Sequence, residues 1–255
     1  MNKHTIGFIT GCLNSQKTIS PKNLYYRQIL NLFNQEDNSS NIEMVLGSYF
    51  SYSQFQETTL NFIKNKNPDM VFIFLRAFPL MPLNKPFFKY KMTDEIISWS
   101  VHPSLFNRKN FHWDEKFSKY EKEIDYNTRV RKKIELRDFN LLVGLLLGLN
   151  SWCVKFLMNR IKAIKNDSNS YNKKLFIISL PRNPESLMGN YICKKTNRKI
   201  RKRLSNELDF VDIYHIPKIF YEDDGIHFNT PGHEQIAKVL FQAIKREIDS
   251  GVVLS

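Results

Sequence analysis

The chain of 255 residues has room for one large α/β domain or two small ones, and no repeat or low-complexity linker divides it. Its 42% hydrophobic and 25% charged residues exclude a chain that is disordered throughout. The 38 Lys and Arg residues against 25 Asp and Glu give a formal charge of +13. This charge favours anionic partners such as nucleic acid, an anionic membrane or an acidic polysaccharide, without choosing among them.

Cysteine usage and the first residues indicate the compartment. Cys12, Cys153 and Cys193 are widely spaced and odd in number, so no disulfide framework is expected. A reducing, cytoplasmic location fits them best. The N-terminal apolar run is too short for the core of a secretory signal and predicts a first strand instead.

One apolar segment, residues 141–158, raises the question of a membrane span. Asn150, Ser151 and Lys155 interrupt it, and it falls short of the roughly 20 residues that a spanning helix needs. We therefore expect a buried core helix, while peripheral contact of this helix and the basic surface with a membrane stays open.

Strands and helices are predicted to alternate along the whole chain. Short apolar runs that end at glycine, proline or turn residues predict strands at 5–10, 42–46, 70–75, 175–180 and 210–214. Apolar residues at helical spacing predict helices at 24–33, 54–65 and 139–163 and from Thr230 onward, and the charged stretch 120–137 is also helical in character. This order predicts one domain over 1–255, a three-layer α/β/α sandwich of flavodoxin-like type with a central, mostly parallel sheet.

Two stretches stand outside this alternation. Residues 77–113 are rich in aromatic residues and proline and form a predicted insertion near the site. Residues 194–207 are strongly basic, and a solvated loop is favoured there over a nucleic-acid site because no nucleic-acid motif accompanies them. No specific nucleic-acid partner is expected.

Ligands of such sheets bind beyond the carboxyl ends of the strands, so the segments after Thr10, Leu46, Leu75 and Leu180 should surround one cleft. The most specific motif of the chain, Asp-Asp-Gly-Ile-His-Phe-Asn-Thr-Pro-Gly-His at 223–233, comes just before the last predicted helix.

Within this motif, Asp224 and His227 are three residues apart. A carboxylate at that spacing can accept a hydrogen bond from Nδ1 of the imidazole and leave Nε2 free to take a proton. Asp223 is the alternative carboxylate, but the spacing favours Asp224.

The motif, together with the order of the elements, resembles the last conserved block of the SGNH/GDSL hydrolases. The resemblance implies the fold of that family and a Ser-His-Asp triad that includes Asp224 and His227. His233 matches the histidine at the helix start and is expected to be structural.

The nucleophile is less clearly marked, because the loop after the first strand reads Gly-Cys-Leu-Asn-Ser and lacks the family's Gly-Asp-Ser. Ser15 is the candidate nucleophile, with His227 as its base. Cys12 is the rival, and a site without a nucleophile is the third reading.

The expected oxyanion donors are the N–H groups of Ser15 and Gly47, the glycine that ends the second predicted strand. The family's third block, Gly-x-Asn-Asp, is absent, and Arg76 stands where its asparagine should be. Arg76 can donate to an oxyanion or hold an anionic group of a substrate. The Leu-Arg-x-Phe-Pro pattern around it is similar to divergent SGNH-like proteins of bacterial polysaccharide gene clusters.

The first functional hypothesis is therefore a serine esterase or O-acyltransferase, of the deacetylase or acetyltransferase type. Its expected substrate is an acylated carbohydrate or another ester, and the class includes anionic substrates. The alternative is a catalytically impaired SGNH-like module that binds a glycan or a protein. No metal-ligand spacing is present, and the triad chemistry requires no cofactor. The sequence does not determine the acyl group, the sugar or the oligomeric state.

Overall fold

The computed structural model describes residues 3–11, 13, 16, 19–36, 41–49, 54–77, 89–92, 95–98, 134–182, 184, 186–204, 207–222 and 227–251, with the backbone alone given at 89–92, 95–98 and 134–137. Several predicted features lie outside these residues: Cys12, Ser15, Asp223, Asp224, most of the 77–113 insertion and most of the charged stretch 120–137.

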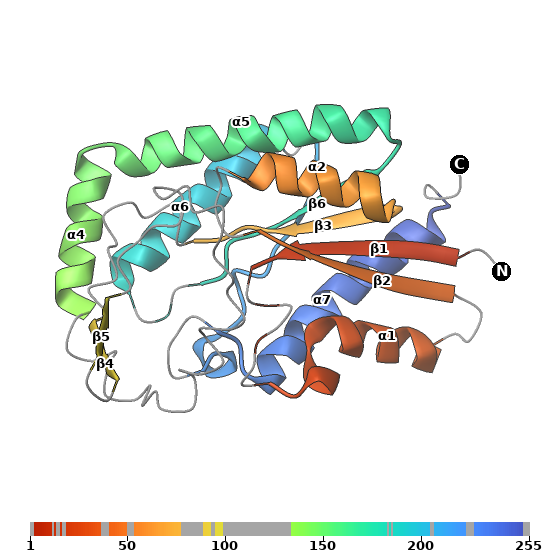
Figure 1. Cartoon of the computed structure of the whole chain (residues 1–255), viewed down its shortest axis with the longest axis horizontal. Coiled ribbons are helices and arrows are strands. Elements are labelled where there is room, and N and C mark those ends of the chain that lie inside the picture. The colour runs from red at the N-terminus through yellow and green to blue at the C-terminus, as the bar shows by residue number, and fades with distance from the viewer. Residues whose placement is uncertain are drawn as a thin grey trace.

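The centre of the molecule is a parallel sheet of five strands in the order β2-β1-β3-β6-β7 (Figure 1). The strands are β1 (Lys3–Thr10), β2 (Asn41–Ser48), β3 (Met70–Phe74), β6 (Lys174–Ile178) and β7 (Asp209–Val211). Separate from it, β4 (Lys89–Met92) and β5 (Glu95–Ser98) pair antiparallel. All five predicted strands are present, and the predicted parallel sheet is confirmed.

Helices cover both faces of this sheet (Figure 1). They are α1 (Tyr25–Glu36), α2 (Phe55–Lys66), α4 (Ile134–Leu146), α5 (Leu149–Ser170), α6 (Leu187–Leu204) and α7 (Thr230–Asp249), with short 3₁₀ turns η2 (Pro21–Asn23) and η6 (Lys218–Phe220). Helices α1 and α7 share one buried cluster with the sheet, and α2, α5 and α6 share the other. The predicted three-layer α/β/α architecture is therefore confirmed.

Residues of β3 show why the sheet is apolar on both sides. Every residue of this central strand is buried, as expected of a parallel strand between two helical layers. Phe72 faces α1 and α7, whereas Val71 and Ile73 face α2 and α5. A strand alternates its side chains between faces, so an unbroken apolar run serves both layers at once.

The predicted helix at 139–163 is in fact two helices. Gly148, with φ of 72°, ends α4 and begins α5, and the axes of the two helices differ by 75°. Helix α5 also continues to Ser170, beyond the predicted end at residue 163. Among the described residues no single helix has the length and apolar composition of a membrane span, although the bent pair of α4 and α5 together does.

The basic segment 194–207 is helical up to Leu204, so the predicted loop there is wrong. It forms most of α6, whose buried side chains recur every three or four positions, at Ile192, Cys193, Thr196, Asn197 and Ile200. This periodicity buries one face of the helix against the sheet and leaves the basic residues on the opposite face.

Candidate active site

The carboxyl ends of β1, β2 and β3 are linked by backbone and side-chain hydrogen bonds. The backbone N–H of Tyr49, just after β2, donates to the carbonyl oxygen of Thr10 at 2.9 Å. Nη1 of Arg76, which follows β3, donates to the carbonyl oxygen of Tyr49 at 2.9 Å. The guanidinium carbon of Arg76 lies 5.9 Å from the centre of the Tyr49 ring. Arg76 therefore lies at the edge of the sheet where ligands of this architecture bind.

Gly11, the first residue beyond β1, lies directly beneath this arginine. A Cβ atom at Gly11 would be 2.7 Å from Nε of Arg76, so a side chain there would displace the guanidinium. The absence of a side chain at Gly11 thus lets Arg76 cross the end of β1. The loop that follows Gly11 is the one that carries Ser15.

Gly47 lies inside β2, which continues to Ser48, rather than after the strand as predicted. A Cβ atom at Gly47 would be 2.6 Å from the Phe62 ring on α2, so this glycine makes room for helix packing. Alternate residues of a strand direct their N–H groups to the same side, and Tyr49 donates to β1. The N–H of Gly47 therefore also faces β1, and its role as an oxyanion donor stays a prediction.

His227 lies in a loop that is closed at its base. Tyr221 and Phe228 form an antiparallel bridge, and the N–H of Glu222 donates to the carbonyl oxygen of His227 at 2.8 Å. Asn229 then caps α7, because its Oδ1 accepts the N–H of Gly232 at 2.9 Å and its Nδ2 donates to the carbonyl oxygen of Ile219. The half-buried imidazole of His227 is thus held between a closed loop and a capped helix.

Gln16 connects this loop to the loop after β1. Its Nε2 donates to the carbonyl oxygen of Phe228 and to Oε1 of Glu222, each at 2.8 Å. The Gln16 side chain is buried, and its hydrogen bond to Phe228 is shielded from water. Gln16 follows Ser15 in sequence and Phe228 follows His227. The two loops that carry the predicted nucleophile and base are therefore joined one residue away from each.

His233 supports Gln16 from the first turn of α7. Its Nδ1 accepts the backbone N–H of Tyr25, and its Nε2 lies 3.1 Å from Oε1 of Gln16. Since Nδ1 is an acceptor, the proton of the neutral ring is on Nε2 and is donated to Gln16. The ring is completely buried and stacks on Tyr25. These contacts give His233 a structural role, in agreement with the expectation from the sequence.

The charge of His233 is set by burial and by its neighbour. Burial, and then the positive charge of His227, lower the pKa of His233 from 6.5 to about 4. A neutral His233 adds no positive charge beside His227, so a proton arriving on His227 meets no second imidazolium.

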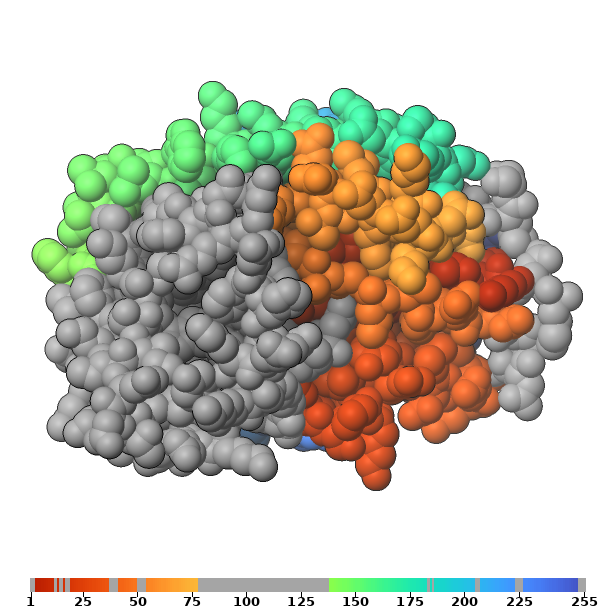
Figure 2. Space-filling view, in the orientation of Figure 1, coloured from red at the N-terminus to blue at the C-terminus, as the bar shows by residue number. Residues whose placement is uncertain are grey.

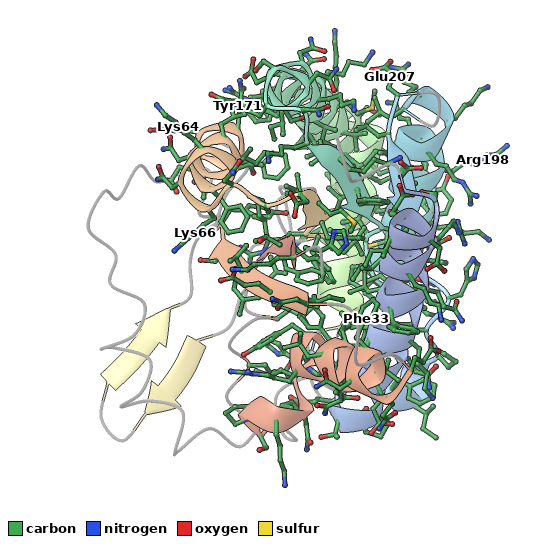
Figure 3. All side chains as sticks on the ribbon, turned by 90° about the vertical axis from the view of Figure 1, so that its right-hand side faces the viewer. Phe33, Lys64, Lys66, Tyr171, Arg198 and Glu207 are labelled. Atoms are coloured by element: carbon green, nitrogen blue, oxygen red, sulfur yellow. The ribbon has the colours of Figure 1, made fainter. Side chains whose placement is uncertain are left out.

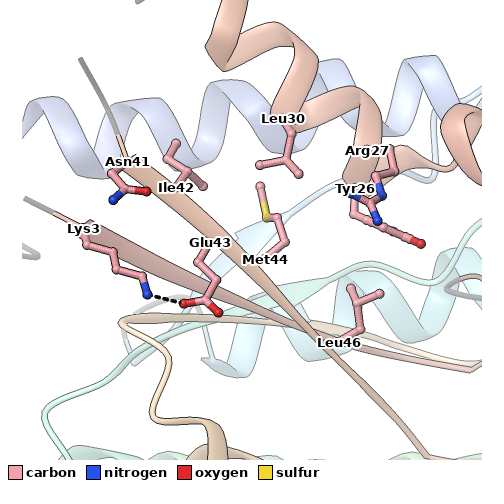
Figure 4. A pocket seen from close by; sticks show the side chains of 9 residues that line it. All are labelled: Lys3, Tyr26, Arg27, Leu30, Asn41, Ile42, Glu43, Met44 and Leu46. Carbon is pink, nitrogen blue, oxygen red and sulfur yellow. Dashed lines mark ion pairs between the residues drawn. The ribbon is translucent and has the colours of Figure 1, made fainter. Parts of the chain in front are cut away.

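A groove of about 490 Å³ lies elsewhere, between α1 and the edge strand β2 (Figure 4). Lys3 and Glu43 form an ion pair of 2.7 Å across it. Lys3 and Asn41 are paired at the amino ends of β1 and β2. The groove therefore runs along the side of the sheet and contains none of the predicted site residues.

No group of three or more His, Cys, Asp or Glu side chains gathers as metal ligands in the part of the chain that the structure describes.

Solved esterase structures share this fold over almost the whole chain. A family 3 carbohydrate esterase from Clostridium thermocellum superposes with a TM-score of 0.56 at 13% identity, over 97% of this chain and 99% of its own. A GDSL-like lipase from Bacteroides thetaiotaomicron gives 0.52 at 12%, over 95% and 88%. A variant of an acetyl-xylooligosaccharide esterase from Geobacillus gives 0.58 at 11%, over 94% of both chains.

The chain has the SGNH/GDSL hydrolase fold. The resemblance inferred from residues 223–233 is confirmed at the level of the fold. No protein-family model matches the sequence, and no curated protein matches it.

Among the predicted site residues, the structure describes His227, Gly47 and Arg76. Arg76 follows the carboxyl end of β3, and His227 lies in the chain that follows β7. Sequence reasoning missed Gln16, because a glutamine beside a serine carries no signal of its own. The histidine after Gly232 was noticed, but the sequence does not show which residue it contacts.

Proposed function

We propose that this chain is a serine esterase or O-acyltransferase that acts on an acylated carbohydrate through Ser15, His227 and Asp224. The observation that carries the proposal is the 2.8 Å hydrogen bond from Nε2 of Gln16 to the carbonyl oxygen of Phe228. It joins the two loops that hold Ser15 and His227 in the sequence, as a Ser-His pair requires.

In the proposed reaction, the hydroxyl oxygen of Ser15 attacks the acyl carbonyl while Nε2 of His227 takes the hydroxyl proton. Asp224 orients His227 and stabilises the imidazolium. The tetrahedral intermediate then collapses, His227 gives the proton to the departing sugar oxygen, and an acyl-enzyme forms. Water completes an esterase cycle, and a sugar hydroxyl completes an acyltransferase cycle.

The developing oxyanion needs hydrogen-bond donors. We assign this role to the N–H of Ser15 and above all to Arg76, whose guanidinium lies over Gly11 at the start of the Ser15 loop, because the N–H of Gly47 faces β1 within the sheet. Losing one such donor typically lowers the rate about 10²–10³-fold. An arginine in place of the family's asparagine also favours a substrate with a negative charge, such as an acidic sugar.

The carbohydrate part of the proposal is supported by the solved structures, since a carbohydrate esterase and an acetyl-xylooligosaccharide esterase share the fold. The alternative of a non-catalytic glycan-binding module is favoured by the lack of Gly-Asp-Ser and Gly-x-Asn-Asp in the sequence.

A serine-directed fluorophosphonate probe, followed by peptide mapping, separates these two functions. We expect labelling at Ser15 in the wild type, none in Ser15→Ala, and labelling about 10²–10⁴-fold slower in His227→Ala, because the general base is removed. His215→Ala is the matched control, since that histidine is exposed on a neighbouring loop.

Labelling at Cys12 would move the nucleophile to that residue. A folded protein that is not labelled at all would contradict the esterase and leave the binding module.

A further inference from the structure

Large apolar side chains are exposed near the carboxyl edge of the sheet. We call them the apolar rim: Phe139, Leu146, Leu147, Trp152, Leu187 and Tyr191. Trp152 is 68% exposed and Leu187 is 84% exposed. Helix α5 ends at Ser170, and a tight turn leads from it to the amino end of β6 at Lys174. The first residues of α5 therefore lie at the opposite, carboxyl edge of the sheet. Helix α6 begins after β6 and so starts at the same edge.

Hydrogen bonds connect the start of α4 with the start of α6, so rim residues of the two helices lie near one another. Asp138 on α4 accepts the hydroxyl of Ser186 and, at 3.3 Å, the N–H of Leu187. These bonds place Leu187 beside the first described side chains of α4. Phe139 and Leu146 are seven positions apart and lie on one side of that helix. Figure 2 shows α4 and α5 as one exposed band along the molecule.

The solvent face of α6 continues the rim as a row of positive charge. This basic stripe consists of the exposed residues Lys194, Lys195, Arg198, Arg201, Lys202 and Arg203. Helix α6 contains no acidic residue. Arg198 points from it into solvent (Figure 3). The ion pairs of the described residues involve other lysines and His215, and none of them includes a residue of this stripe.

We propose that the apolar rim and the basic stripe dock the protein on the surface of an anionic lipid bilayer. Exposed Leu, Phe and Trp side chains enter the boundary between headgroups and acyl chains, and basic residues are attracted to anionic headgroups. Nucleic acid or an acidic polymer would use the charge and leave the apolar rim without a role. A second copy would bring two basic surfaces of a chain with charge +13 together.

The first residues of α5 and α6, which carry part of the apolar rim, lie at the carboxyl edge of the sheet, where the candidate site also lies. The proposed docking does not depend on the triad, so vesicle binding and probe labelling test separate statements.

The experiment is co-sedimentation of the full chain with vesicles of phosphatidylcholine alone and of phosphatidylcholine mixed with phosphatidylglycerol. We expect binding to the mixed vesicles that weakens as salt is added. Neutralising Arg198→Gln and Lys202→Gln together should weaken binding about 30-fold. The matched pair Lys64→Gln and Lys66→Gln, exposed on α2 (Figure 3), should change it less than about threefold.

A second pair of variants tests the apolar rim. Replacing Leu146→Ser and Trp152→Ser should weaken binding about tenfold or more, because both side chains leave water on docking. Tyr171→Ser, at the opposite end of α5, should have no effect. Circular dichroism confirms that each variant is folded.

Three results would overturn the proposal. The first is no sedimentation with mixed vesicles at low salt. The second is an equal loss in the α2 pair, which would reduce the effect to net charge. The third is full binding by the Leu146 and Trp152 variant, which would indicate a purely electrostatic polyanion site.

Discussion

At the scale of single residues, His233 and Gln16 show how buried polar groups organise the candidate site. The imidazole accepts from Tyr25 and donates to Gln16, and Gln16 in turn donates to Phe228 and Glu222. A buried polar group costs free energy unless it is hydrogen-bonded, so each member of this chain of bonds depends on the next. The network thereby restricts the relative position of the two loops.

His233 also predicts how stability depends on pH. Its pKa is lowered to about 4 in the folded chain, so the unfolded chain binds this proton first as the pH falls below 6.5. Stability is then complete above pH 6.5 and decreases as the pH falls toward 4. We expect a loss of about 2 kcal/mol from this group between pH 7 and pH 5.

Urea unfolding at both pH values measures this loss. The variant His233→Asn, which cannot titrate there, should show a smaller difference between the two pH values than the wild type. Equal differences would contradict the assignment of the pH dependence to His233.

At the scale of elements, two glycines lie at the beginnings of helices for different physical reasons. Gly148 adopts a left-handed φ of 72° between α4 and α5, and a Cβ atom there would meet open space. Gly232 lies in the first turn of α7, and a Cβ atom there would be 2.2 Å from the carbonyl oxygen of Phe220 in η6. The first glycine is required by backbone conformation and the second by close approach.

Replacing each glycine by alanine should separate these two causes. We expect Gly148→Ala to cost about 1 kcal/mol of unfolding free energy, because only the backbone is strained. Gly232→Ala should cost about 3 kcal/mol, because η6 must move away from α7. Thermal or urea unfolding measures both, and a smaller loss for Gly232→Ala than for Gly148→Ala would contradict the close approach.

Helix α6 shows that amino-acid composition alone does not predict the structure of a segment. Its 18 residues include seven Lys or Arg, which suggested a solvated loop. The apolar and small residues between them recur at helical spacing, and this period decides the structure because only a helix buries them together. The charged residues of this segment occupy only the solvent-exposed face of the helix.

At the scale of the whole molecule, stability comes from a sheet that is buried on both faces. Phe72 in the central strand stacks on Phe8, with ring centres 5.3 Å apart, and on Phe176, with ring centres 4.4 Å apart. These three side chains join β1, β3 and β6 beneath α1 and α7. Removing one ring would leave a cavity at the middle of this layer.

We therefore expect Phe72→Ala to lower the free energy of unfolding by about 3–5 kcal/mol, through lost burial and the cavity that remains. Phe139→Ala, on the exposed side of α4, is the control and should change stability by less than about 0.5 kcal/mol. Similar losses in both variants would mean that Phe139 is covered in solution.

Much of the architecture was determined by the sequence itself. The unbroken apolar run at 70–75, alternating with helical periods before and after it, required a sheet covered on both faces. The motif at 223–233 carried the resemblance to the SGNH/GDSL hydrolases, because Asp224, His227 and the capped helix are close in sequence. Patterns of this kind involve residues that are close in the sequence, so they can be recognised from the sequence alone.

Tertiary structure alone decided how the site is assembled. The bond between Gln16 and Phe228 spans 212 positions, and the crossing of Arg76 over Gly11 depends on the order β2-β1-β3 in the sheet. Contacts between such distant residues follow from the packing of layers and the register of strands. No local pattern in the sequence encodes these contacts, so only the tertiary structure shows which residues are partners.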